Sequence, residues 1–178
     1  DGLADDSIHS MALAPDGALW AATWQGVSWF DGEQWQTFPL ERSLIGNDFH
    51  PIAIAPDGAA WIGTGAGAAR FDGQTWRTFT STDGLVEGAI RSIHVASDGA
   101  LWFASGHAGV ARFDGATWRR FDRTDGLTGD GVYCVNEGPD GVLWFGTGSG
   151  IARFDGAGWR TYTTTDGLPD DAVTSIVV

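Results

Sequence analysis

The side chains best suited to chemistry stand in short turns that are otherwise rich in Gly and Ala. Trp24 and His107 are the two large polar or aromatic side chains in such turns, and pockets commonly use an aromatic ring with a few polar groups. Together with neighbouring and corresponding positions they form the expected ligand-binding set: Trp24, Gln25, His50, His107 and Ser149. The alternative is that all five are ordinary exposed loop residues.

Acidic residues recur between the strand-like runs and suggest a second kind of site. Carboxylate oxygens suit hard cations such as Ca²⁺, but the D-x-[DN]-x-[DN]-G spacing of a dedicated calcium loop is absent from the sequence. We therefore expect no cofactor, unless this rim holds Ca²⁺ or another divalent cation; a solvated acidic rim is the competing interpretation. The residues of the rim are Asp5, Asp6, Asp48, Glu87, Asp130, Asp170 and Asp171.

Two glycine-rich motifs resemble phosphate loops but stand in the wrong context. "GTGAG" (63–67) and "GTGSG" (146–150) are followed by "AARF" and "IARF", which begin strands. A phosphate loop needs a helix N-terminus after its glycines, so these motifs are predicted to be hairpin turns. No Ser/His/Asp set or Cys/His cluster stands out, and the single Cys134 is expected to be a buried filler. No catalytic residue is assigned.

Composition excludes several classes of partner. The net charge is −13, and all ten basic residues are Arg. Nucleic acids and anionic membrane surfaces need a basic footprint, so neither is an expected partner. No apolar run of about 18 residues occurs, which predicts no insertion into a membrane.

The turns are set in a repeat of 41 or 42 residues. Asp16, Asp57, Asp98 and Asp140 each precede a Gly, and their spacings are 41, 41 and 42 residues. One unit contains four strand-like runs separated by Gly-rich turns, which is typical of an antiparallel four-stranded sheet. Their ranges in the third unit are 91–96, 100–105, 109–113 and 117–121.

Sheets of this kind bury both faces by packing radially, as blades of a propeller. We therefore predict an all-β fold, a β-propeller with four complete blades plus one extra strand. The expected blades are 1–41, 42–82, 83–124 and 125–165, and residues 166–178 are expected to supply the first strand of a further blade.

Recurring aromatic residues fit packing between blades, because large rings fill the space between sheets. Each unit carries a Trp on its second run, a Phe on its third and a Trp on its fourth. In the third unit these are Trp102, Phe113 and Trp118. An Arg precedes the Phe in three units (Arg70, Arg112, Arg153) and is expected to pair with a nearby Asp, whereas the first unit has Trp29 there.

Several phrases resemble a known repeat family. "DGLPDDAVTSIVV" (166–178), "DGVLWFGTGSGIARFDG" (140–156) and "WRTYTTTDGL" (159–168) are similar to the two-component regulator propeller repeat. The resemblance implies a β-propeller sensor region, extracytoplasmic and often linked to glycan sensing, without catalytic residues of its own. "GPDGVLWF" (138–145) also resembles, more weakly, repeats of the virginiamycin B lyase family, which implies a His base and Mg²⁺.

The sequence thus favours a non-catalytic ligand-binding, sensor or scaffold module that takes a glycan or another small molecule. A propeller enzyme, either a lyase or a glycan-acting hydrolase, is the first alternative. A purely structural, self-assembling repeat module, which includes the case of an engineered fragment, is the second. Because exposed strand edges seek pairing, we also expect the chain to associate with itself, most simply as two copies that make eight blades.

Overall fold

The computed structural model describes residues 2–39 and 51–178, which form four antiparallel sheets of four strands. Blade 1 comprises β1 (Ile8–Leu13), β2 (Leu19–Thr23), β3 (Gly26–Phe30) and β4 (Trp35–Pro39). Blade 2 comprises β5 (Ile52–Ile54), β6 (Ala60–Thr64), β7 (Gly67–Phe71) and β8 (Trp76–Phe79). Blade 3 comprises β9 (Ile90–Val95), β10 (Leu101–Ser105), β11 (Val110–Phe113) and β12 (Trp118–Phe121). Blade 4 comprises β13 (Val132–Glu137), β14 (Leu143–Thr147), β15 (Gly150–Phe154) and β16 (Trp159–Tyr162).

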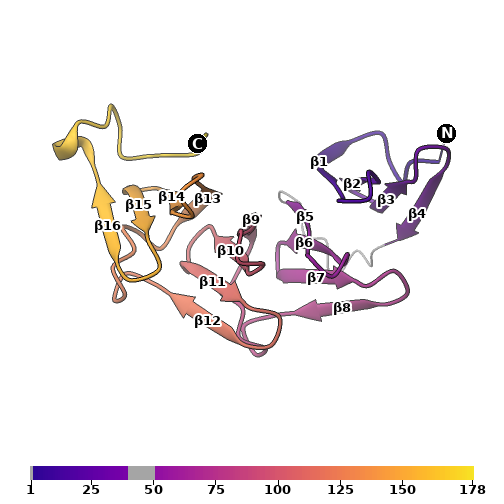
Figure 1. The fold of residues 1–178 in the computed structure, drawn as a ribbon, viewed down its shortest axis with the longest axis horizontal. Helices are drawn as coiled ribbons and strands as arrows, with labels where there is room; N and C mark the ends of the chain where they lie inside the picture. Colours follow the sequence, from indigo (N-terminus) through magenta and orange to yellow (C-terminus); the bar gives the residue numbers. More distant parts are fainter. Residues whose placement is uncertain (1, 40–50) are drawn as a thin grey trace.

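The blades stand side by side in an open arc (Figure 1). The first strands β1, β5, β9 and β13 lie on the inner side, and the fourth strands β4, β8, β12 and β16 lie on the outer side. Within every blade the strands pair in chain order. The predicted all-β propeller architecture is confirmed.

Two kinds of turn connect the strands at opposite ends of each blade. We call the end with the second-to-third-strand turns and the crossings between blades the top face. The bottom face carries the other two turns of each blade. At a bottom turn, Asp98 Oδ1 accepts a hydrogen bond from the Ala100 N–H at 2.9 Å, and Gly99 has a φ of 82° that suits glycine.

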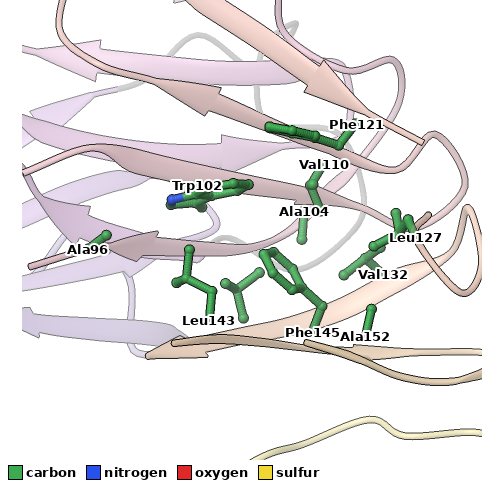
Figure 2. Close-up of a cluster of buried hydrophobic side chains, with 11 residues drawn as sticks. Ala96, Trp102, Ala104, Val110, Phe121, Leu127, Val132, Leu143, Phe145 and Ala152 are labelled. Atoms are coloured by element: carbon green, nitrogen blue, oxygen red, sulfur yellow. The ribbon is translucent and has the colours of Figure 1, made fainter. Parts of the chain in front are cut away.

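Aromatic and aliphatic side chains fill the space between successive blades, as predicted. Trp102 of β10 is 1% exposed and packs against Phe145 and Phe154 of blade 4, with ring centroids 5.4 and 5.7 Å away. Figure 2 shows Trp102 and Phe121 of blade 3 facing Leu143 and Phe145. Since a single blade buries only one side of such rings, its stability depends on its neighbours.

The crossing from one blade to the next also bonds back to the blade it leaves. The Gly109 N–H donates to the Asp130 carbonyl at 2.7 Å, and a Cβ on Gly109 would lie 2.2 Å from the Phe121 carbonyl oxygen. Only glycine permits this close approach, which explains why a Gly stands at the same place in every repeat.

The extra strand expected at the end of the chain differs from the prediction in one respect. The Gly150 N–H donates to the Asp171 carbonyl at 2.6 Å, and Asn136 Nδ2 donates to the Ile176 carbonyl at 2.7 Å. The segment 171–178 therefore lies against blade 4 as a first strand would. Within the described residues it has no second strand to pair with, so it is extended chain rather than a strand of a sheet. No helix in 2–39 or 51–178 is long and apolar enough to cross a membrane.

Candidate functional site

The predicted ligand-binding residues that the structure describes lie on the top face, in turns of three different blades. Trp24 is 38% exposed, and its ring meets His9 edge-on at a centroid distance of 4.4 Å. Gln25 Nε2 donates to Asp5 Oδ2 at 2.8 Å. His107 and Ser149 are exposed in the equivalent turns of blades 3 and 4. His50 lies outside the described residues, and the assignment of this set to a ligand stays a prediction.

Carboxylates of the expected acidic rim make local hydrogen bonds. Asp171 Oδ1 accepts from the Thr164 N–H at 2.7 Å, and Asp170 Oδ1 accepts from the Ala172 N–H at 2.8 Å. The Ser7 N–H and the Gln25 amide bond to the Asp5 carboxylate and lower its pKa. Asp48 lies outside the described residues. Within 2–39 and 51–178, no three His, Cys, Asp or Glu side chains are grouped to hold a metal ion.

Clefts between successive blades open at the bottom face, opposite the predicted site. The cleft between blades 3 and 4, called cleft 3–4, has a volume of about 330 Å³, and Trp102, Phe121 and Phe154 are among its lining residues. Two guanidinium groups also line it: Arg112 Nη2 lies 2.8 Å from Asp98 Oδ2, and Arg119 Cζ lies 4.4 Å from the Phe121 ring centroid. In cleft 3–4 one arginine thus holds the Asp98 carboxylate and the other lies over the Phe121 ring.

The Arg–Asp pairing expected from the sequence is confirmed in three blades. Arg70 and Arg112 bond to Asp57 and Asp98, each at 2.8 Å, and Arg153 bonds to Asp155 at 3.1 Å. Partial burial acts to raise the pKa of Asp98. The hydrogen bonds from Arg112 and from the Ala100 N–H, together with the Arg112 charge, outweigh burial, and the pKa lies below its ordinary value.

The cleft between blades 1 and 2, called cleft 1–2, is larger and has a different lining. Its volume is about 530 Å³. Trp29 stands where the other blades have Arg70, Arg112 and Arg153, and Gln36 stands where they have Arg77, Arg119 and Arg160. Both residues line the cleft, together with Trp20, Phe38 and Phe71 and the carboxylates of Asp16 and Asp57.

These two replacements change the charge of the cleft. Among the described residues that line cleft 1–2, the charged ones are Asp16 and Asp57, and Asp57 is held by Arg70. Asp16 Oδ1 accepts from the Ala18 N–H at 3.0 Å, and no cation within the described residues pairs with this carboxylate. An aromatic cavity of this size, with the Asp16 carboxylate and the Gln36 amide in its lining, is suited to bind a small ligand.

A histidine and a glutamate also meet between blades 3 and 4. His94 Nε2 lies 3.6 Å from Glu137 Oε2, while the Ser97 N–H and Oγ donate to the two oxygens of Glu137, each at 2.6 Å. Burial lowers the pKa of His94, although the Glu137 carboxylate acts to raise it. The Nε2 atom of His94 is buried, whereas Glu137 is one of the residues that line cleft 3–4.

Cleft 1–2 was not predicted from the sequence as a site. Trp29 stood out there as the exception to the Arg rule, which is the signal that identifies the cleft. Gln36 carries the same signal one strand later. Reading both positions across all four repeats would have found the pair.

Two segments of the chain, 2–25 and 126–149, match the family of the two component regulator propeller. The matched segments are one crossing with its first two strands in blade 1 and the corresponding part of blade 4. The resemblance stated from the sequence is therefore confirmed for these repeats. No curated protein sequence matches the chain.

Solved structures share the propeller fold. The extracellular domain of the hybrid two component system BT3049 from B. thetaiotaomicron is 23% identical with a TM-score of 0.76, over 92% of this chain and 24% of that one. A catalytically inactive virginiamycin B lyase from Staphylococcus aureus, solved with quinupristin, is 17% identical with a TM-score of 0.69, over 89% of this chain and 57% of that one. The chain thus spans only part of these proteins, and regulator domains and enzymes share its fold.

Proposed function

We propose that this chain is a non-catalytic ligand-binding module of a sensor or scaffold, and that cleft 1–2 is its binding site. The observation that carries the proposal is that Trp29 and Gln36 of blade 1 replace the two arginines that the other three blades have at these positions, and that both residues line cleft 1–2. Three blades keep both arginines. The blade that loses both borders cleft 1–2, which is larger than cleft 3–4, and its volume of about 530 Å³ lies within the range of about 300–1,000 Å³ that is common for ligand pockets.

Two further features support binding over catalysis. The titratable pair His94 and Glu137 lies between other blades, and its imidazole nitrogen is buried. The match to the two component regulator propeller also agrees with a sensing role, because the extracellular domain of BT3049 is part of a two component system. A sensor needs a pocket for its ligand, and the size and lining of cleft 1–2 support its assignment as that pocket.

The test compares ligand-induced thermal shifts in wild type and in Trp29→Arg. Neutral oligosaccharides, organic cations and divalent cations form the panel. We expect at least one compound to raise the Tm of the wild type without being chemically changed, and Trp29→Arg to abolish that shift by filling the cleft with a guanidinium group. A shift that survives in Trp29→Arg but is lost in His107→Ala would overturn the assignment to cleft 1–2 and favour the top face.

A further inference from the structure

We propose that the ligand of cleft 1–2 carries a guanidinium group, and that this group takes the place of the arginines that blade 1 lacks. The inference rests on the proposed function and gives its ligand a chemical class. It follows from the way the other clefts of the same molecule are filled.

The other blades show what the aromatic ring of the fourth strand holds where the arginine is present. Arg77, Arg119 and Arg160 lie over the rings of Phe79, Phe121 and Tyr162, with distances from Cζ to the ring centroid of 4.6, 4.4 and 4.9 Å. A cation within about 6 Å of a ring centroid is attracted by the negative face of the ring. In blade 1 the corresponding ring is Phe38, where Gln36 replaces the arginine and no cation from residues 2–39 or 51–178 lies over the ring.

The carboxylate at the mouth of the cleft repeats the pattern. Asp57 and Asp98 each hold an arginine of their own blade at 2.8 Å. Asp16 occupies the same place in blade 1, where the partner position is Trp29. Cleft 1–2 therefore keeps both groups that elsewhere receive guanidinium, the ring and the carboxylate, but lacks the guanidinium itself.

The aromatic residues of the cleft form a surface that a planar cation can cover. Trp20 is 7% exposed and stacks on Phe38, with ring centroids 6.1 Å apart and an interplanar angle of 22°. Trp29 stands beside Trp20 at 6.4 Å and 51°. Two aromatic walls and one carboxylate favour a flat group with several N–H donors over a compact ammonium, because guanidinium stacks on rings and binds carboxylates through two parallel hydrogen bonds.

The experiment titrates Nα-acetyl-arginine methylamide into the protein and follows the indole N–H signals by NMR. The citrulline compound, which is neutral and nearly the same shape, is the matched ligand. We expect the arginine compound to bind at least about tenfold more tightly, since it adds both a charge-assisted hydrogen bond and a cation–π contact. A Gly-Gly-Arg-Gly-Gly peptide tests whether the guanidinium group belongs to a small molecule or to a polypeptide. Binding of the arginine compound or of the peptide supports the proposal, and tighter binding of the peptide indicates a polypeptide partner.

Paired variants locate the site. Asp16→Asn is expected to weaken binding about tenfold, whereas Asp98→Asn, the equivalent change in cleft 3–4, should leave the affinity unchanged. Trp29→Arg is expected to abolish binding, and Ala157→Arg, which adds the same charge in an exposed bottom turn of blade 4, should not.

The two proposals fail in different ways. Equal binding of the arginine and citrulline compounds, or unchanged binding in Asp16→Asn, overturns the guanidinium assignment while cleft 1–2 remains a binding site. If Trp29→Arg leaves the binding of every ligand unchanged, the proposed function at this cleft is wrong. Should Trp29→Arg fail to fold, the pair Asp16→Asn and Asp98→Asn still decides the guanidinium assignment.

Discussion

Cleft 1–2 and cleft 3–4 occupy equivalent places between blades, but their walls carry different side chains. Cleft 3–4 holds Arg112 and Arg119, together with Glu137 on its inner side. Cleft 1–2 has Trp29 and Gln36 in the arginine positions, and Ile54 stands where cleft 3–4 has Glu137. The repeat thus fixes the backbone and the buried rings, while a few positions at the clefts decide which side chains and charges line each one.

The largest expected effect comes from removing a ring that is buried between blades 3 and 4. Trp102 is 1% exposed between blades 3 and 4, so Trp102→Ala should lower the free energy of unfolding by about 3–5 kcal/mol through lost burial and a new cavity. Urea unfolding measures the loss. Trp29→Ala in cleft 1–2 is the comparison, and because Trp29 is only half-buried its loss should be clearly smaller. Equal losses would contradict the view that Trp29 serves a ligand more than the fold.

The fold follows from the sequence to a large extent because the same interactions recur every 41 or 42 residues. Strand ends coincide with Gly turns, and a Trp stands second in the second strand of every blade: Trp20, Trp61, Trp102 and Trp144. A repeat unit cannot bury these rings alone, so repetition itself predicts radial packing.

The candidate site was harder to predict because its parts come from different strands and two blades. Trp29 is the penultimate residue of β3, Gln36 belongs to β4, and Gly73 follows β7 of the next blade, yet all three line one cavity. Sequence reasoning expected function at variable turns of the top face. The sequence identified Trp29 as an exception to the repeat. It did not predict the cleft beside Trp29, because the cleft depends on how far the two blades separate at the bottom face.

Blade 1 has one face that packs against blade 2 and an opposite face that no blade of the described residues covers (Figure 1). This uncovered face can be compared with the face of blade 2 that packs against blade 1. Met11 and Leu13 of β1 are 60% and 71% exposed, whereas Ile52, at the place of Met11 in blade 2, is 7% exposed against blade 1. We predict that the 18.9 kDa chain associates through this face, and that Met11→Ser with Leu13→Ser lowers the mass toward that of a monomer. Sedimentation measures the mass.

Tyr133→Ser, which removes an exposed ring from blade 4, is the control and should not change the mass. A wild type that stays monomeric at every concentration would show that the face of blade 1 does not drive self-association.

A double variant of blade 3, called the transplant, tests whether Arg112 and Arg119 prevent cleft 3–4 from binding the same ligand as cleft 1–2. Arg112→Trp with Arg119→Gln gives blade 3 the two residues of blade 1 and frees Asp98 and Phe121. We expect the variant to bind two molecules of Nα-acetyl-arginine methylamide in place of one. The stability should change little, since exposed ion pairs contribute only about 0–1 kcal/mol. Isothermal calorimetry gives the stoichiometry.

The matched control for the transplant keeps both charges: Arg112→Lys with Arg119→Lys should bind one molecule, as the wild type does. A folded transplant that still binds one molecule would mean that other differences between the clefts, such as Ile54 against Glu137, create the site.

The smallest expected effect concerns pH and the inner side of cleft 3–4. Burial lowers the pKa of His94 below its ordinary value of 6.5, so the unfolded chain binds a proton at that residue more readily than the folded chain does. Stability should therefore fall as the pH drops through about 6.5, and this loss should level off below the folded pKa of His94. Ala12 and Ala53 occupy the same place in blades 1 and 2.

His94→Ala gives cleft 3–4 the residue that cleft 1–2 already has. Thermal unfolding of wild type and variant between pH 7.5 and about 5 should show a steeper loss in the wild type, and the other histidines, present in both proteins, cancel in the difference. Glu137 keeps its hydrogen bonds from Ser97 in the variant, which isolates the imidazole. Parallel curves would mean that Glu137 offsets burial fully, and the inner walls of the two clefts would then differ in packing but not in their response to pH.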